Sequence, residues 1–143
     1  MDMVGEMQLN ILIVDDIEIN RRVEALIAKK LGHQADLAEN GNEAIEALKN
    51  KSYDIVLMDI QMPEKDGLET TKIIREMWPN GPRIIIVTSQ DVNHDTCLDA
   101  GASEFLLKPL RVETLRDAIE RNMPLRLTGM GYVNEITAIC SVD

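Results

Sequence analysis

Five polar side chains in this sequence stand at the ends of apolar runs, and their types suit metal binding and phosphoryl transfer. Asp15 and Asp16 directly follow one apolar run, and Asp59 follows another. Thr88 and Lys108 end two further apolar runs. If these runs are parallel strands, their carboxyl ends lie together at one edge of a sheet, where such sheets hold ligands. We therefore expect three carboxylates, one hydroxyl and one ammonium group to converge on one site.

The three carboxylates would repel one another strongly without a cation between them. Carboxylate, carbonyl and water oxygens suit Mg²⁺, with Mn²⁺ as an alternative. Zn²⁺ is disfavoured because no His or Cys lies near these strand ends in the sequence. A carboxylate beside Mg²⁺ can attack phosphorus as a nucleophile and form an acyl phosphate. Thr88 would then donate a hydrogen bond, and Lys108 a positive charge, to the remaining phosphoryl oxygens.

Each of these residues has a simpler interpretation when it is taken alone. Asp16 could only cap the helix that follows it. Thr88 could bond to the backbone, and Lys108 could be a solvated loop residue. Their joint order, spread over four separate strand–helix units, is hard to obtain by accident. The pattern as a whole therefore favours a phosphoryl site over unrelated structural roles.

Apolar runs alternate with helical patterns five times, and this alternation predicts the elements that position the five side chains. Strands are expected at about 9–14, 34–38, 53–58, 83–88 and 104–107. Right-handed crossovers between them give a parallel sheet with helices on both faces, a doubly wound α/β fold. The second run alternates apolar and polar residues, so we expect it at an edge. The continuous apolar runs suit central strands.

The helices between these strands have recognisable inward faces. The first is expected to end at Gly32, which can form a C-terminal cap. Its predicted inward residues are Val23, Leu26, Ile27 and Leu31. The third helix continues through Met77, and the fifth spans about 111–122.

The starts of three helices are predicted from capping residues. Asn40 with Glu43, and Asp66 with Glu69, have the spacing of capping boxes for the second and third helices. Asp91 can cap the fourth helix. Side-chain caps at these positions would satisfy backbone N–H groups that have no partner within the helix.

Composition limits the class of protein. The chain of 143 residues fits one domain with a real core. Its net charge of −10 argues against nonspecific nucleic-acid binding and against binding to an anionic membrane surface. No run reaches about 18 consecutive apolar residues, so no membrane span is expected. Residues 1–10 do not have the pattern of a signal peptide. We expect Cys97 and Cys140 to be free thiols in a reducing cytoplasm.

Taken together, the motifs closely resemble the receiver domain of response regulators in two-component signalling. The resemblance covers about residues 8–122 and is strongest to receivers of hybrid sensor kinases and their stand-alone relatives. The residues that show it are, in chain order, Val14-Asp15-Asp16, the stretch 57–67, Thr88-Ser89, Gly101-Ala102 and Phe105-Leu106-Leu107-Lys108-Pro109. The resemblance implies a flavodoxin-like sheet of five parallel strands in the order 2-1-3-4-5, with five helices.

The resemblance also implies a role for each residue of the site. Asp59 would be the phosphoacceptor. Asp16 would be the main metal carboxylate, and Asp15 would assist through a water molecule. The backbone carbonyl of Gln61 would be a further metal ligand. Lys108 would pair with the phosphoryl group.

Further residues are implicated in switching and in the lifetime of the phosphorylated state. Thr88 would be the switch hydroxyl, and the peptide bond that precedes Pro109 would be cis. Phe105 stands at the position of the switch aromatic, where it has no phenolic hydroxyl; a plain core aromatic is the alternative. Gln61 and Gln90 would flank the phosphoryl group, and their amides cannot act as strong general bases for an attacking water.

The function implied by the resemblance is that of a response regulator. It would accept a phosphoryl group on Asp59 from a histidine kinase or a histidine phosphotransfer protein. Phosphorylation would switch a surface made by the fourth helix, the fifth strand and the fifth helix. That surface would bind a downstream protein or a second copy of the chain, without direct DNA binding or membrane insertion. The chain would catalyse only its own phosphorylation and dephosphorylation, in the cytoplasm.

Domain boundaries leave two forms of this function open. We expect a leader over 1–8, a receiver domain over 9–122 and a tail over 123–143 with no second domain. This organisation favours a stand-alone regulator; a receiver module excised from a hybrid histidine kinase or larger regulator is the alternative.

Two other classes share part of the pattern. A phosphatase of the haloacid-dehalogenase type needs a second acid where Gln61 stands. A flavodoxin-type flavin binder needs a loop rich in glycine and hydroxyl groups after the first strand, where this chain has two aspartates.

Overall fold

Strands and helices alternate along the chain, as the periodicity predicts. The structure is a computed structural model, and it describes residues 8–60, 66–89 and 94–123. The elements are β1 (Asn10–Val14), α1 (Glu18–Lys30), β2 (Gln34–Ala38), α2 (Gly41–Asn50), β3 (Ile55–Met58), α3 (Gly67–Met77), β4 (Arg83–Thr88), α4 (His94–Ala100), β5 (Glu104–Leu107) and α5 (Val112–Asn122). All neighbouring strands pair in parallel, in the order β2-β1-β3-β4-β5. The predicted fold class, and the edge position of β2, are confirmed.

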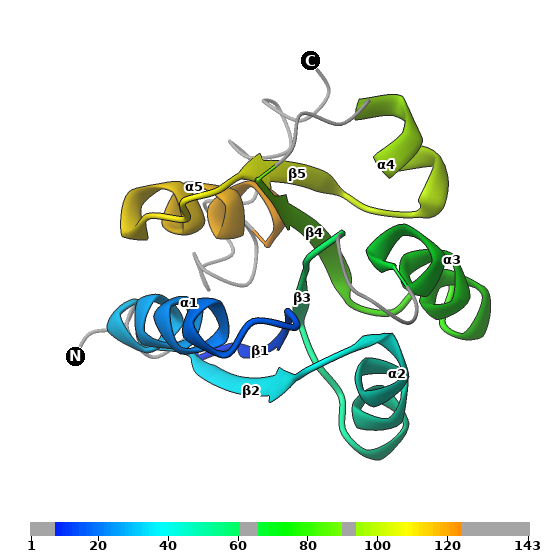
Figure 1. Ribbon diagram of the computed structural model, residues 1–143, viewed down its shortest axis with the longest axis horizontal. Helices are drawn as coiled ribbons and strands as arrows, with labels where there is room; N and C mark the ends of the chain where they lie inside the picture. The colour runs from blue at the N-terminus through cyan, green and yellow to red at the C-terminus, as the bar shows by residue number, and fades with distance from the viewer. Residues whose placement is uncertain (1–7, 61–65, 90–93, 124–143) are drawn as a thin grey trace, which may run out of the picture.

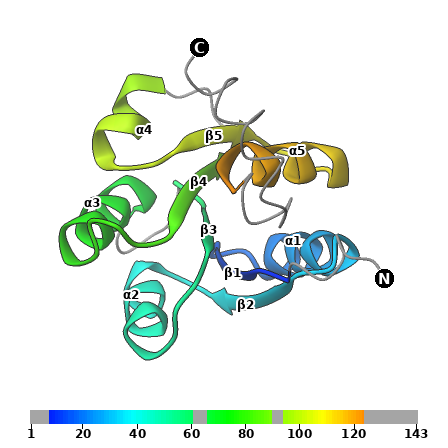
Figure 2. The ribbon, with the colours of Figure 1, turned by 180° about the vertical axis from the view of Figure 1, so that it is seen from behind.

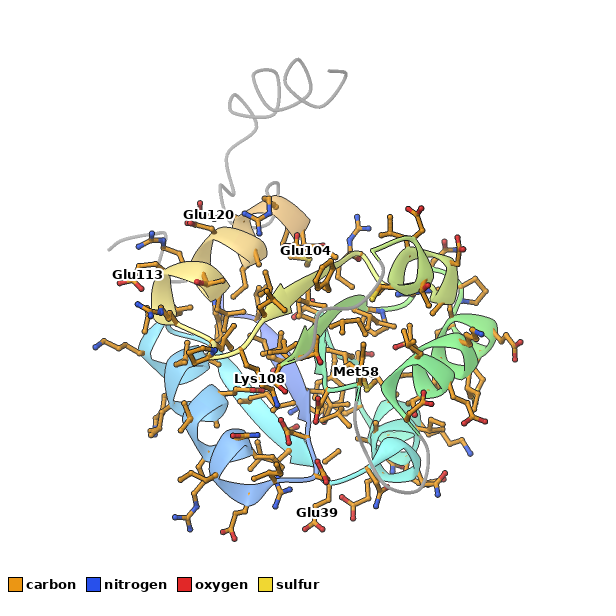
Figure 3. All side chains as sticks on the ribbon, turned by 45° about the horizontal axis from the view of Figure 1, so that its top comes forward. Glu39, Met58, Glu104, Lys108, Glu113 and Glu120 are labelled. Atoms are coloured by element: carbon orange, nitrogen blue, oxygen red, sulfur yellow. The ribbon has the colours of Figure 1, made fainter. Side chains whose placement is uncertain are left out.

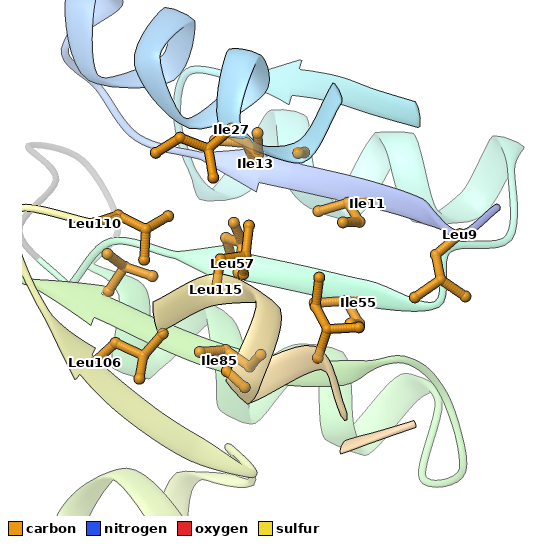
Figure 4. Packing of buried hydrophobic residues seen from close by; sticks show 14 residues of the cluster. Leu9, Ile11, Ile13, Ile27, Ile55, Leu57, Ile85, Leu106, Leu110 and Leu115 are labelled. Atoms are coloured by element: carbon orange, nitrogen blue, oxygen red, sulfur yellow. The ribbon is translucent and has the colours of Figure 1, made fainter. Parts of the chain in front are cut away.

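Helices cover both faces of the sheet. Figures 1 and 2 show α1 and α5 on one face and α2, α3 and α4 on the other. Successive residues of a strand point to opposite faces, so a strand covered on both sides must be apolar throughout. The cluster toward α1 and α5 (Figure 4) includes Ile11, Ile13, Ile55, Leu57, Ile85 and Leu115. The intervening residues Leu12, Val56 and Ile86 pack in a second cluster on the opposite face. None of the described helices is long and apolar enough to cross a membrane.

Side-chain caps fix the starts of α2 and α3. The side chain of Asn40 accepts a hydrogen bond from the N–H of Glu43, and that of Asp66 accepts one from Glu69, both at 2.8 Å. The Glu43 carboxylate accepts a hydrogen bond from the N–H of Glu39, one residue before the cap. The predicted caps therefore set the turns that follow β2 and precede α3.

Other expectations on the helices have mixed outcomes. Gly32 follows α1 with a φ of 93°, which confirms it as the residue that ends this helix. The third helix continues through Met77 as expected, and Met77, its last residue, is exposed. Asp91 and Cys140 lie outside the described residues. Cys97 is a buried free thiol.

The inward face of α1 differs from the predicted one. Ile27 is buried as expected, but Val23 is 44% exposed and Leu26 is 66% exposed. The buried positions nearer the start of the helix are Arg21 and Glu24. These two charged side chains are buried in the first turns of α1, close to the carboxyl ends of the strands. The prediction was wrong because it allowed only apolar residues on the inward face.

Candidate functional site

The register of the sheet brings the predicted site residues to one edge. Asp15 and Asp59 each stand one residue beyond the last paired position of β1 and β3. Lys108 stands one residue beyond β5, beside Thr88 at the end of β4. Sheet-like backbone hydrogen bonds continue through these positions. The N–H of Asp15 donates to the last residue of β2 (3.1 Å), that of Asp59 to the last residue of β1 (2.9 Å), and that of Lys108 to Thr88 (2.8 Å). The backbone of the site is therefore as firmly placed as the sheet itself.

Three carboxylates gather at this edge. Asp15, Asp16 and Asp59 each offer one oxygen, and these oxygens lie within 4.8 Å of one another. Asp15 and Asp59 are buried, whereas Asp16 is exposed. The N–H of Ile17 donates to Oδ1 of Asp15 at 2.9 Å, which fixes one side of that carboxylate. Oxygen atoms at this spacing suit a hard divalent cation such as Mg²⁺, which accepts one or two carboxylates and keeps several waters.

Lys108 partly neutralises the acids. Its Nζ donates to Oδ2 of Asp15 at 2.8 Å and lies 3.7 Å from Oδ1 of Asp59. Figure 3 shows it beside the end of β3, where Met58 is labelled. Burial alone would lower the pKa of Lys108, but the hydrogen bond to Asp15 and the charge of Asp59 outweigh burial and raise it. The ammonium group therefore stays charged. The bond from Lys108 to Pro109 is cis, as predicted.

Glu24 is a fourth carboxyl group near the site. It lies in the second turn of α1 and is only 4% exposed. Burial is the main cause that raises the pKa of Glu24 to about 8; the charge of Asp15 raises it further, Lys108 lowers it and Asp59 raises it. This carboxyl group therefore holds its proton at neutral pH, and it adds little negative charge to the cluster.

Neither Glu24 nor Arg21 was predicted to lie near the site. Arg21 is 9% exposed, and its Nη1 donates to the backbone carbonyl of Asp15 at 2.8 Å. Arg21, Glu24 and the buried Ile27 follow one another at a spacing of three residues. The helical period would have placed the two charged residues inward if charged side chains had been considered for that face.

Thr88 and Phe105 lie on the neighbouring strands β4 and β5. Thr88 is fully buried at the end of β4. Phe105 pairs with Ile86 in the register of β4 and β5, and its half-buried ring packs against the cluster on the side of α2, α3 and α4. A change at Thr88 would therefore be close to the packing of Phe105, while the switch roles of both residues stay predictions.

Gln61 and Gln90 lie outside the described residues, so their roles also stay predictions. Gly67, at the start of α3, has a clear structural role. Its N–H donates to the carbonyl of Ile60 at 2.9 Å, and a Cβ at this position would collide with the backbone carbonyl of Asp59. Glycine thus lets α3 begin directly against the backbone of Asp59.

A wide hollow of about 1180 Å³ lies at the opposite end of the sheet. It is lined by the turns that precede β3, β4 and β5 and by the end of α5, and it includes none of the three clustered acids. The chemistry of the side chains, rather than the size of a hollow, therefore locates the site.

Comparison with known proteins agrees with this fold. Residues 11–120 match the family model of the response regulator receiver domain. This chain belongs to the response regulator receiver family. The match spans β1 to α5, so the receiver domain includes every strand that contributes to the site.

Relatives in sequence include hybrid histidine kinases. The domain is 40% identical over 122 residues to the hybrid signal transduction histidine kinase K of Dictyostelium discoideum, a stretch that is 78% of this chain and 10% of that protein. The chain spans between 4% and 15% of the length of the curated relatives it matches.

Two solved receivers are similar in structure. The receiver domain of a sensor histidine kinase of Pseudomonas aeruginosa PAO1 is 31% identical with a TM-score of 0.72, over 80% of this chain and 97% of that one; it has a magnesium ion coordinated in its active site cleft. The second is the receiver domain of Saccharomyces cerevisiae Ssk1, co-crystallised with the histidine phosphotransfer protein Ypd1. It is 25% identical with a TM-score of 0.76, over 84% of this chain and 92% of that one. These findings confirm a receiver domain of two-component signalling.

Glu24 gives the receiver a specific dependence of stability on pH. Its pKa is about 8 in the folded protein against a usual 4.5, so the folded state keeps a proton that the unfolded chain loses between these values. The contribution of Glu24 to stability is therefore present below pH 4.5 and is lost as pH rises to about 8. We expect the free energy of unfolding of the native chain, relative to Glu24→Gln, to fall by about 2–4 kcal/mol between pH 5 and pH 8.

Urea unfolding in metal-free buffer, followed by the fluorescence of the single tryptophan, Trp78, measures this difference. Glu24→Gln keeps the size of the side chain and removes its titration. A difference between the two proteins that does not change with pH would show that Glu24 ionises in the ordinary way.

Proposed function

We propose that this receiver accepts a phosphoryl group on Asp59 from a phosphohistidine of a signalling partner, and thereby switches a protein-binding surface. The observation that supports Asp59 is its place in the cluster of acids, with the ammonium group of Lys108 at 3.7 Å. An oxygen of Asp59 would bond to phosphorus while the bond from phosphorus to the histidine nitrogen breaks. The chain would catalyse only this transfer and the later hydrolysis of its own acyl phosphate, in the cytoplasm.

Asp15, Asp16 and Asp59 are the residues that would hold Mg²⁺ or Mn²⁺, together with the backbone carbonyl of Gln61. The metal would supply positive charge to phosphoryl oxygens and lower the repulsion between them and the carboxylates. Lys108 already bonds to Asp15 at 2.8 Å, and it would turn from that carboxylate toward the phosphoryl group. Thr88 would donate its hydroxyl hydrogen to a second phosphoryl oxygen.

Phosphorylation should depend on both Asp59 and the metal. We expect acetyl phosphate with Mg²⁺ to label the native chain with a hydroxylamine-sensitive acyl phosphate. Asp59→Asn, which removes the nucleophile, should abolish the label, and excess chelator should reduce it by at least about tenfold, because the phosphoryl charge then meets unscreened carboxylates. Intact-mass measurement detects the added phosphoryl group. Asp54→Asn, at a carboxylate away from the cluster, is the control, and undiminished labelling in chelator would contradict the proposal.

The exposed side of α1 is the surface that we assign to the phosphodonor. Ile19, Val23 and Leu26 are 62%, 44% and 66% exposed, and their spacing puts them on one side of the helix. We call these three residues the α1 apolar strip. It begins three residues after Asp16, and Ile17 between them is 48% exposed. A protein that delivers a phosphoryl group to Asp59 must cover this edge, and would bury the strip as it does so.

Polar substitutions in the α1 apolar strip should slow phosphoryl transfer from a protein donor but not from a small-molecule donor. For the variant Ile19→Gln with Leu26→Gln, we expect transfer from a phosphorylated histidine phosphotransfer protein, with Ypd1 as the first probe, to slow by about tenfold. Labelling by acetyl phosphate should not change, because the site is intact. Leu98→Gln, at an exposed position of α4, is the matched control. Rapid-quench autoradiography measures the transfer rate. Equal rates for the native and variant chains would show that the donor binds another surface.

The output surface that we propose is formed by α4, β5 and α5. Leu98 and Leu107 are 43% and 53% exposed on it, and Phe105 lies between this surface and the core. If Thr88 moves toward a phosphoryl group, space opens beside the end of β4 into which the ring of Phe105 can rotate. The two states would then differ in packing and not in a hydrogen bond of the ring, since Phe105 has no hydroxyl. A downstream protein, or a second copy of the chain, would bind the phosphorylated form more tightly.

NMR shift mapping with beryllofluoride and Mg²⁺ tests this switch. Beryllofluoride stands in for the phosphoryl group on Asp59. We expect shifts of the ring signals of Phe105 and of amides in α4, β5 and α5, and no comparable shifts in α2. Sedimentation of the same sample shows whether a second copy is the occupant. Shifts confined to the ends of β1 and β3 would rule the switch out.

A further inference from the structure

We propose that Arg21 is a positioning residue for metal binding, which holds the peptide between Asp15 and Asp16 so that the Asp16 carboxylate faces the metal. This inference rests on the proposed function, because it assumes that Asp16 is a metal ligand. Arg21 lies on the first turn of α1 with only 9% of its surface exposed. The guanidinium group is buried here although, among residues 8–60, 66–89 and 94–123, the carboxylate that forms an ion pair with it is that of Glu39, at 3.8 Å.

The main contact of Arg21 is with backbone. Nη1 donates to the carbonyl oxygen of Asp15 at 2.8 Å, in a buried position. Nη2 lies 3.8 Å from Oε2 of Glu39, which is labelled in Figure 3 at the turn after β2. The N–H of Glu39 is in turn held by Glu43 at 2.8 Å. Arg21 therefore connects the turn after β1 to the turn after β2.

The carbonyl of Asp15 belongs to the same planar peptide group as the N–H of Asp16. A hydrogen bond that fixes this oxygen therefore fixes the orientation of the whole peptide plane, and with it the direction in which the Cα of Asp16 leaves the strand. The other polar groups of Asp15 are also held: its N–H by β2, Oδ1 by Ile17 and Oδ2 by Lys108.

Asp16 has no comparable support of its own. Within the described part of the chain, no hydrogen bond or ion pair holds its exposed carboxylate. Its position is set by its backbone, and the peptide plane next to it is set by Arg21. Groups that orient a metal ligand commonly change metal affinity by about 10- to 100-fold when they are removed. Because Arg21 acts through the backbone, we expect an effect at the lower end of this range.

The charge of Arg21 and its positioning role predict opposite effects of its removal on the affinity for Mg²⁺, so the experiment distinguishes the two. Removing a cation near three carboxylates strengthens the binding of Mg²⁺ if only charge matters. Removing a positioning residue weakens it. Arg22 is the matched control, since it is the next residue, has the same charge, and is exposed with Glu18 as its ion-pair partner at 3.5 Å.

The experiment is an NMR titration of the full chain with Mg²⁺ alone, with Arg21→Met, Arg21→Lys and Arg22→Met as variants. We expect Arg21→Met to raise the Kd for Mg²⁺ about tenfold and to shift the amides of Asp16 and Ile17 before metal is added. Arg21→Lys, which keeps one donor, should restore part of the affinity. Arg22→Met should stay within about twofold of the native value or bind slightly more tightly. Urea unfolding of each variant separates affinity from stability.

Unchanged or tighter Mg²⁺ binding by Arg21→Met would overturn the proposal, as would equal weakening by Arg21→Met and Arg22→Met. If Arg21→Met does not fold, Arg21→Lys decides: a Kd raised at least about threefold supports the role, and a native Kd overturns it. Labelling of the native chain by acetyl phosphate is measured in parallel. If the native chain binds Mg²⁺ and is labelled, and Arg21→Met binds Mg²⁺ equally well, only this inference is wrong. If the native chain neither binds Mg²⁺ nor is labelled, the proposed function is wrong.

Discussion

The mutual repulsion of three carboxylates is the constraint on which this receiver depends. Oxygens of Asp15, Asp16 and Asp59 lie within 4.8 Å of one another, and backbone hydrogen bonds to neighbouring strands hold Asp15 and Asp59 in place. Lys108 reduces the repulsion by bonding to Asp15, and Glu24 adds little to it because burial raises its pKa. The negative charge that remains suits the site to a divalent cation. Buried charges that are only partly compensated are costly to folding, so this part of the domain serves chemistry at the expense of stability.

The sheet could be predicted almost completely from sequence, because its central strands are buried on both faces and therefore apolar throughout. β2, β4 and β5 have the predicted bounds. β3 begins at Ile55 and not at residue 53. The side chain of Asp54 accepts a hydrogen bond from the N–H of Asn10 at 2.9 Å, and Tyr53 donates its hydroxyl to Asp36 at 2.6 Å. These side-chain contacts accompany backbone hydrogen bonds from Asp54 to Asn10 (2.8 Å) and from Arg83 to Asp54 (3.0 Å) just before β3, and no periodicity in the sequence indicates them.

The site could be predicted only in part, for a related reason. That the acids converge follows from parallel strands, since their carboxyl ends share an edge. Arg21 can be buried because it bonds to a backbone group, the carbonyl of Asp15. Glu24 is buried near the charge of Lys108, which is far away in the sequence. Hydrophobic periodicity cannot detect such partners. It therefore placed Val23 and Leu26 inward, although both are exposed. Nζ of Lys108 lies 2.8 Å from Oδ2 of Asp15 and 3.7 Å from Oδ1 of Asp59, and only the structure shows this difference.

The α1 apolar strip has a consequence for how this molecule meets others. The whole chain has a net charge of −10, so at low ionic strength it repels other acidic proteins before any apolar contact can form. If a partner binds the strip as proposed, it would reach the strip quickly only if basic groups surround its own apolar patch. Discrimination among many similar signalling proteins would then begin in the rate of encounter, ahead of any fit between surfaces. Such discrimination would weaken as salt screens the field.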